Sequence, residues 1–176
     1  MRSLEDQLSA YAAYHRDRRN IATHFVGVPM IVLAVTVLLS RPSIDIAGLA
    51  LSPAVLAIVV TSLYYLRLDR PLGALMTGLL VLSGLFGAWA AALPTPLWLA
   101  VGLGGFVVGW VIQFVGHVWE GRKPAFVDDL MGLIIGPLFV TVEALFLMGR
   151  LPALKAVIEG RVGPTRAGPA QRQAAA

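Results

Sequence analysis

Long apolar runs, separated by short polar segments, dominate the pattern of this chain. Four of them are about 20 residues long, the length that a helix needs to cross the hydrocarbon core of a bilayer. They comprise residues 21–39, 46–66, 72–93 and 97–118. A fifth run, residues 130–148, contains a Gly136-Pro137 pair, so it either spans the membrane or breaks at Pro137 and re-enters. The pattern predicts an all-α fold, a multi-pass integral membrane helical bundle with four to six membrane-embedded helices.

The N-terminal segment has a different pattern. In residues 4–18, the side chains of Leu4, Leu8, Tyr11 and His15 follow one another at helical spacing and form one stripe. This spacing predicts an amphipathic helix. Such a helix is expected to lie in the membrane interface.

Individual residues and the local composition indicate where helices and the domain begin and end. Asn20 is the expected N-cap of the first apolar helix, and Pro29 and Pro53 are expected inside the first two helices. After residue 160 the chain is rich in Gly, Pro, Ala and Gln. We therefore expect a single membrane-embedded domain, residues 1–160, followed by a disordered polar tail, residues 161–176.

The composition agrees with a membrane protein. Hydrophobic residues make up 57% of the 176 residues and charged residues 14%, whereas a soluble domain has about 25% charged residues. The absence of cysteine excludes disulfides, thiolate metal sites and cysteine nucleophiles. The formal charge of +4 lies mostly outside the apolar runs and is not interleaved with exposed aromatic residues. This distribution favours membrane lipids over nucleic acid as partners.

The three histidines of the chain are far apart in sequence but are expected to meet. His24 opens the first apolar run and His117 closes the fourth, so an even number of crossings lies between them. Both therefore belong at one face of the membrane, together with His15 just before the first crossing. Most Lys and Arg residues flanking these runs lie at the same face, which predicts that it is cytoplasmic. The preference for Arg over Lys favours a bacterial inner membrane, or the endoplasmic reticulum if the source is eukaryotic.

A polar stripe at the end of the fourth run indicates a metal site. Gln113, His117 and Glu120 share one helix face, and polar groups at this depth need a partner. Three converging imidazoles suit Zn, Fe, Cu or Ni, and Glu120 or Glu143 is a candidate further ligand or orients an imidazole. Alternatively, the histidines contact lipid head groups, Gln113 hydrogen-bonds a neighbouring helix, and Glu143 pairs with Arg150.

Three segments of the chain resemble the Mpo1-like family: YAAYHRDRRNIATHFVGVP, GWVIQFVGHVWEGRKPAFVDDL and GPLFVTVEALF. The similarity extends to about Gly160. It implies an Fe(II)-dependent membrane dioxygenase that shortens 2-hydroxy fatty acids by one carbon, as in fatty-acid alpha-oxidation. The implied cofactor is Fe²⁺, and the implied substrates are a 2-hydroxy fatty acid and O2.

The resemblance also assigns expected roles to residues. It makes His15, His24 and His117 the iron ligands, and these three with Glu120 and Glu143 form the expected catalytic set. Other positions that match the family pattern are Asn20, Gln113, Pro124, Asp128 and Pro137. There is one departure: the family acid follows the last histidine by four residues, whereas Glu120 follows His117 by three. The resemblance therefore does not make Glu120 a ligand.

The expected substrate-binding residues are Arg19, Gln113, Arg122 and Lys123, because the cations can steer a substrate carboxylate. The alternative for Arg122 and Lys123 is contact with lipid head groups. Two other functions stay open from the residues alone. One is a non-catalytic small membrane protein that binds or transports lipid and has a structural metal site. The other is a zinc hydrolase that acts on lipid.

Overall fold

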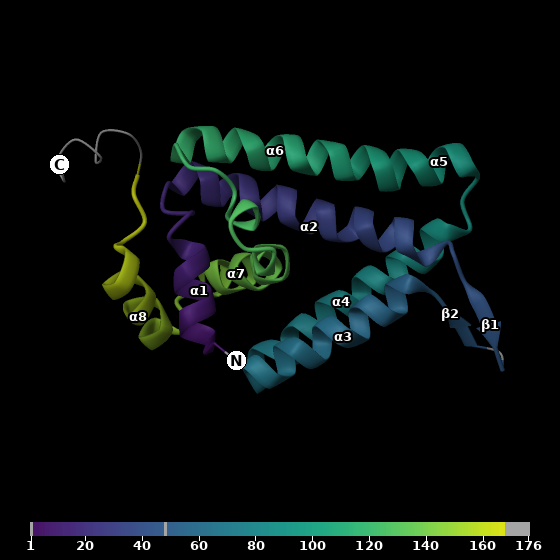
Figure 1. The fold of residues 1–176 in the computed structure, drawn as a ribbon, viewed down its shortest axis with the longest axis horizontal. Helices are drawn as coiled ribbons and strands as arrows, with labels where there is room; N and C mark the ends of the chain where they lie inside the picture. Colours follow the sequence, from purple (N-terminus) through teal and green to yellow (C-terminus); the bar gives the residue numbers. More distant parts are fainter. Residues whose placement is uncertain (1, 48, 168–176) are drawn as a thin grey trace. The chain divides into compact units, whose positions relative to one another are not determined.

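The structure is a computed structural model that describes residues 2–47 and 49–167 (Figure 1). Helices account for most of these residues, which confirms the all-α prediction. The chain forms two compact units, one of Met1–Val28 with Val111–Ala176 and one of Pro29–Trp110. Each unit is described in turn.

The first unit contains the helices near both chain ends. They are α1 (Leu4–Ala12), the short helix η2 (Ala125–Val127), α7 (Met131–Leu147) and α8 (Pro152–Val162), with the first turns of α2 (Arg18–Ser40) and the last turns of α6 (Gly105–Glu120). Helix α1 packs against α7 and α8, as the purple, green and yellow ribbons of Figure 1 show. Leu8, Leu138, Phe139 and Ile158 form the buried apolar core of these contacts. Removal of these apolar side chains from water is the main favourable contribution to the free energy of packing these helices in an aqueous environment.

The amphipathic N-terminal helix is shorter than predicted. Ser3 caps α1 through a capping box with Asp6, but the helix ends at Ala12, so His15 lies in the following loop rather than on the helical stripe. The N–H of His15 bonds the carbonyl of Ala12 at 2.9 Å, a three-residue bond that tightens the last turn. Whether α1 lies in a membrane interface stays a prediction.

The predicted N-cap of α2 was also wrong. The helix begins at Arg18, and the carboxylate of Asp17 accepts the Arg19 N–H at 2.9 Å. Asn20 lies inside the helix and is fully buried. The helix therefore starts before the apolar run does, and Asn20 in its first turn donates to the Glu120 carboxylate at 3.2 Å.

The second unit holds the rest of α2, a short hairpin and the central helices. The strands β1 (Ile44–Ile46) and β2 (Leu49–Leu51) pair in antiparallel register, with Ile44 opposite Leu51. They are followed by α3 (Pro53–Leu68), α4 (Arg70–Ala91), α5 (Thr95–Leu99) and the π-helical turn η1 (Ala100–Gly104), which leads into α6.

Helices α3 and α4 form a tightly packed hairpin around Asp69 (Figure 1). The Asp69 carboxylate caps α4 by accepting the Leu72 N–H at 2.8 Å. A Cβ at Gly73 would lie 2.5 Å from the backbone nitrogen of Leu66, so only glycine permits this approach of the two helices. Pro53 is the first residue of α3 rather than an internal residue as predicted, because the apolar residues before it form the hairpin.

The number of membrane spans stays a prediction. Among the described residues, three helical segments are long and apolar enough to cross a membrane, and they are Arg18–Ser40, Arg70–Ala91 and the continuous Thr95–Glu120. A fourth span is possible, which would reach the lower end of the predicted range of four to six. Helix α3 has 16 residues, which rise about 24 Å, less than the roughly 30 Å of a hydrocarbon core. Helices α7 and α8 meet at 115° and count as a fourth span only as a broken pair.

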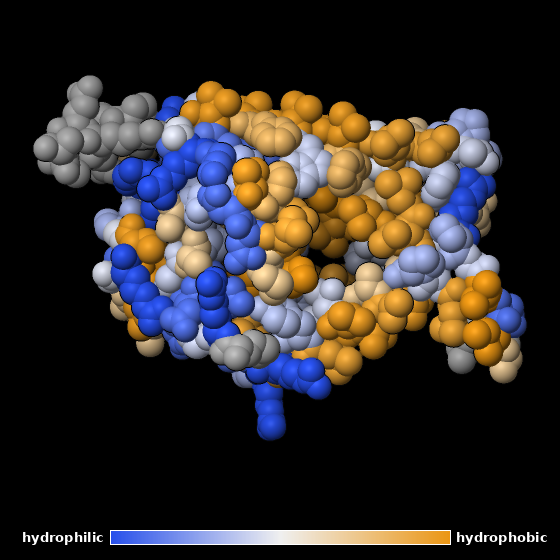
Figure 2. Space-filling model, viewed as in Figure 1, coloured by the Kyte–Doolittle hydropathy of each residue, from blue (hydrophilic) through white to orange (hydrophobic). Residues whose placement is uncertain are grey.

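These segments indicate a membrane protein, and hydrophobic side chains cover the surface over α6 in Figure 2. The fifth apolar run does not break at Pro137, which lies inside α7. The chain turns instead between α7 and α8, where Gly149 and Leu151 have positive φ angles of 73° and 56°.

The polar tail begins later than predicted. Helix α8 continues to Val162, and Arg166 still bonds the backbone of the loop before α2, with its N–H donating to the Arg16 carbonyl at 2.7 Å. Residues 168–176, the rest of the expected tail, lie outside the described residues.

Candidate metal centre

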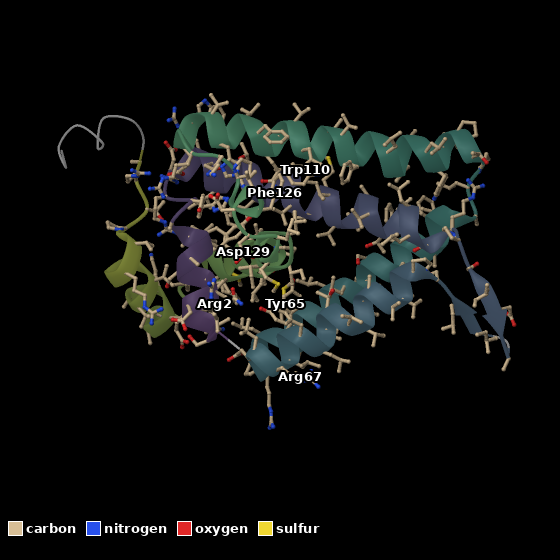
Figure 3. The ribbon with its side chains drawn as sticks, viewed as in Figure 1. Arg2, Tyr65, Arg67, Trp110, Phe126 and Asp129 are labelled. Carbon is tan, nitrogen blue, oxygen red and sulfur yellow. The ribbon has the colours of Figure 1, made fainter. Side chains whose placement is uncertain are left out.

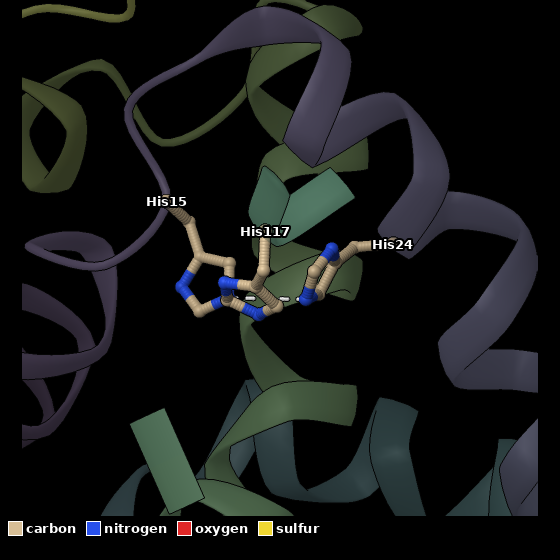
Figure 4. Close-up of side chains that lie close together, drawn as sticks. All are labelled: His15, His24 and His117. Atoms are coloured by element: carbon tan, nitrogen blue, oxygen red, sulfur yellow. Dashed lines mark hydrogen bonds between the residues drawn. The ribbon is translucent and has the colours of Figure 1, made fainter. Parts of the chain in front are cut away.

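Three histidine side chains from separate segments converge in the first unit (Figure 4). His15 comes from the loop after α1, His24 from the second turn of α2 and His117 from the last turn of α6. One nitrogen of each ring lies within 4.8 Å of the other two, and the residues are only 0%, 1% and 6% exposed. The convergence expected from the order of the apolar runs is therefore present.

Hydrogen bonds to the backbone orient two of the rings. The Nδ1 atom of His15 lies 2.8 Å from the carbonyl oxygen of Tyr11, and that of His24 lies 2.8 Å from the carbonyl oxygen of Asn20. A carbonyl oxygen only accepts, so each Nδ1 carries the proton. In a neutral ring, Nε2 then has a free lone pair, the state that a metal ligand requires.

The two free lone pairs point at each other. The Nε2 atoms of His15 and His24 are 3.0 Å apart, a separation that is repulsive unless a proton or a cation lies between them. A proton is disfavoured because burial, and then the neighbouring His24, hold the pKa of His15 well below its ordinary value. The Nδ1 atom of His117 is also buried without a hydrogen-bond partner. A metal cation accounts for the close approach of the two Nε2 atoms.

The donor set fits a transition metal. Two nitrogens at about 2.1 Å from one ion, at right angles, are about 3.0 Å apart, which is the distance found between His15 and His24. No carboxylate belongs to the group among the described residues. Neutral imidazoles suit Fe, Zn, Cu or Ni rather than Mg or Ca.

Aromatic rings form one wall of the centre. Tyr11 stacks on His15 with ring centroids 4.2 Å apart and planes inclined by 7°. Phe139 of α7 contacts both rings, at centroid distances of 5.0 and 5.5 Å. A Cβ at Gly136 would approach the Tyr11 hydroxyl to 2.9 Å, so this glycine allows α7 to come close to Tyr11. The wall holds the His15 ring in one orientation.

Glu120 fastens the histidine loop to the end of α6. One carboxylate oxygen accepts from the backbone N–H groups of Arg16 and Asp17, at 2.9 and 2.6 Å, and from the Asn20 amide at 3.2 Å. The other oxygen accepts from Arg166 at 2.6 Å. Since Glu120 is 2% exposed, these donors replace the water that a buried carboxylate loses.

Glu143 forms a second buried ion pair beside the centre. It lies 3.3 Å from a terminal nitrogen of Arg16, which is 5% exposed. The Arg16 Nε group also donates to the carbonyls of Ala12 and His15, at 3.0 and 2.9 Å. The pairing of Glu143 with Arg150, considered from the sequence, is not formed; Arg16 takes its place. The arginine therefore links α7 to the loop that presents His15.

Residues 1–148, which contain all of this centre except Arg166, match the family described as 2-hydroxy-palmitic acid dioxygenase Mpo1-like. The chain belongs to the Mpo1-like family. It is also 38% identical over 160 residues to the 2-hydroxy-palmitic acid dioxygenase MPO1 of Saccharomyces cerevisiae, an alignment that covers 89% of this chain and 87% of the yeast protein. No solved structure matches the chain. The resemblance seen in its motifs is thus confirmed.

The other candidate residues of this Mpo1-like chain have varied surroundings. Gln113 is 6% exposed, and its side-chain oxygen is buried without a partner. Arg19 pairs with Asp17 at 3.0 Å and lies over the Trp119 ring. Lys123 pairs with Asp128. Arg122 donates to the Ala13 carbonyl at 2.7 Å and lies over the Tyr14 ring.

Three residues around the centre were not expected from the sequence. Arg16 and Asp17 belong to the polar HRDRRN segment, and Arg166 lies in the expected tail. The one available signal was the position of Arg16 directly after His15. The match to the Mpo1-like family ends before Arg166.

Proposed function

We propose that this chain is an Fe(II)-dependent membrane dioxygenase that shortens 2-hydroxy fatty acids by one carbon. For 2-hydroxypalmitic acid the balanced reaction is 2-hydroxypalmitic acid plus O2 giving pentadecanoic acid, CO2 and water. Substrate oxidation supplies all four electrons that O2 takes up, so no further reductant is needed. The names of the family and of the yeast relative support the substrate class.

The observation that carries the proposal is the group of three buried imidazoles with free nitrogens facing one another. His15, His24 and His117 would hold the iron. Bound Fe(II) supplies a redox-active Lewis acid with positions left for substrate and oxygen. The backbone carbonyls of Tyr11 and Asn20 keep two of the rings in the tautomer that binds metal.

The neighbouring acids act as positioning residues in this proposal. Glu120 uses both carboxylate oxygens to hold the His15 loop against α6, and Glu143 holds Arg16. We assign neither to the metal. The unpartnered oxygen of Gln113, one helical turn before His117, is suited to accept the 2-hydroxyl proton of the substrate in a hydrogen bond.

The test is an assay of the purified full chain with Fe(II), O2 and 2-hydroxypalmitate. We expect pentadecanoate and CO2 in equal amounts, with one O2 consumed for each. The metal content is measured in the same preparations. A stoichiometric metal without turnover of any 2-hydroxy acid would favour the non-catalytic lipid-binding protein, and oxygen-independent lipid hydrolysis with zinc would favour the hydrolase.

We further propose that the histidine centre faces the cytoplasm, at a bacterial inner membrane or at the endoplasmic reticulum in a eukaryote. The chain has no cysteine, so a single cysteine placed at the exposed Arg18 reports its side of the membrane without background. Labelling by a membrane-impermeant maleimide only after permeabilisation is the expected result. Labelling of intact cells would contradict this orientation.

A further inference from the structure

A second site lies beside the histidine loop in the same unit. Arg16, Arg122 and Arg166 line a cavity of about 560 Å³ together with small and apolar residues of the loop after α1 and of the C-terminal segment. The three arginines come from three separate parts of the chain. No acidic residue lines the cavity.

Two of the three arginines that line the cavity are paired with glutamates. Glu143 lies 3.3 Å from Arg16, on which Glu159 also acts electrostatically, and Glu120 lies 2.6 Å from Arg166. Arg122 forms no ion pair with any described residue; its contacts are the Ala13 carbonyl and the Tyr14 ring. Each guanidinium has five N–H donors in a planar fork, so Arg122 retains several donors for a further acceptor.

We propose that this cavity is a binding site for the oxyanion head group, carboxylate or phosphate, of a lipid or a small soluble anion. Planar guanidinium groups bind such oxyanions through two parallel hydrogen bonds. Val162 and Pro164 line the cavity and provide apolar contact beside the arginines. The cavity is also larger than an isolated carboxylate or phosphate group, so it has room for the remainder of an organic head group.

The test measures binding and not turnover, so failure of this inference is distinguishable from failure of the proposed reaction. Arg122 is the residue to change, since Arg16 and Arg166 also support the histidine loop through Glu143 and Glu120. Arg122→Gln removes the charge but keeps an N–H donor for the Ala13 carbonyl. Arg67→Gln is the matched control, because Arg67 is exposed on α3 and points away from the helices (Figure 3).

The experiment is native mass spectrometry of the full metal-containing chain in a neutral detergent, titrated separately with phosphatidic acid, palmitate and inorganic phosphate. We expect one bound anion per chain and roughly tenfold weaker binding in Arg122→Gln, the effect of losing a charge-assisted hydrogen bond. Arg67→Gln should bind as the parent does. Arg122→Lys, which keeps the charge but loses the fork, should fall between the parent and Arg122→Gln.

The three titrations distinguish the sources of the anion. Preference for phosphatidic acid or palmitate assigns the site to a lipid, and equal binding of inorganic phosphate assigns it to a soluble anion. If Arg122→Gln melts at a lower temperature, recovery of binding in Arg122→Lys separates the loss of charge from the loss of folding. Absence of binding to all three anions, or equal affinity in the parent and Arg122→Gln, overturns the proposal.

Discussion

The two units of the chain differ in the bonds that their polar side chains form most often. In Pro29–Trp110, hydroxyl groups bond the backbone of their own helix, as Thr36 does with the Val32 carbonyl and Thr77 with the Gly73 carbonyl. In the other unit, polar side chains join distant segments, such as Glu120 to the backbone of Arg16. Local bonds satisfy a helix without specifying its partner. Long-range bonds fix the positions of particular side chains, which a metal site requires.

Substitutions in the two units are expected to differ most in metal content when a histidine is replaced. Replacing His24 by Ala removes one of three converging nitrogens, so we expect loss of the stoichiometric metal and of at least about 99% of the activity. Ser83→Ala changes a buried hydroxyl of the other unit, which bonds the Leu80 carbonyl at 2.7 Å and the Thr36 hydroxyl at 3.4 Å. It should leave the metal content unchanged. Elemental analysis of both purified variants measures this, and full metal content in His24→Ala would remove His24 from the centre.

A smaller but still large effect is expected at Glu120. Glu120→Ala leaves two backbone N–H groups of the histidine loop, and the partly exposed Arg166, without their acceptor. A buried donor that loses its acceptor costs about 1–3 kcal/mol. We expect a clear decrease in the thermal melting temperature and weaker metal binding.

The control for this change is Glu159→Ala, which removes a carboxylate of α8 that pairs with Lys155 at 3.9 Å and is partly exposed. Glu159→Ala should change neither the melting temperature nor the metal binding. If Glu120→Ala binds metal as tightly as the parent chain, then Glu120 does not position the histidine loop.

The convergence of the histidines was predictable because it follows from the order of the helices. His24 begins one long apolar helix and His117 ends another, and the chain between them includes the packed hairpin of α3 and α4. Because the two helices of a hairpin run in opposite directions, α4 ends near the level at which α3 begins, whether or not α3 spans the membrane fully. The prediction therefore does not depend on the exact number of spans.

Other features depend on contacts that no local pattern encodes. Residues Leu49–Leu51 are as apolar as the helices around them, and only their pairing with Ile44–Ile46 reveals a strand. Arg16 is one of several arginines in a polar segment, and its partner Glu143 lies 127 positions away. Arg166 lies in a segment whose composition is typical of disorder, yet its N–H bonds the Arg16 carbonyl. The sequence alone cannot single out these partners.

Glycine substitutions are expected to produce a smaller difference in stability between the two units. A Cβ at Gly116 would clash with the side chains of Thr23 and Asn20, where α2 and α6 cross beside the centre. Gly116→Ala is therefore expected to destabilise the chain by about 1–3 kcal/mol and to weaken metal binding. Gly78→Ala, on α4 of the other unit, meets nothing within 4 Å and should be neutral or slightly stabilising. Denaturant unfolding of both variants in the same detergent measures the difference, and equal stability would show that α2 and α6 adjust freely at this crossing.

The smallest expected effect concerns the exposed loop after α6. Hydrogen bonds from Lys123 and then from Tyr14 hold the pKa of Asp128 below its ordinary value of 3.8. A carboxyl with a lowered folded-state pKa contributes stability above its unfolded pKa, and this contribution is lost as the pH falls through the folded value. Asp128→Asn should therefore lower the melting temperature slightly at pH 7, and the difference from the parent should shrink as the pH falls below about 3.8 and disappear below the lowered folded-state pKa. Because the pair is exposed, salt should also reduce the difference; a difference that persists at low pH would mean that Asp128 acts through packing and not through its charge.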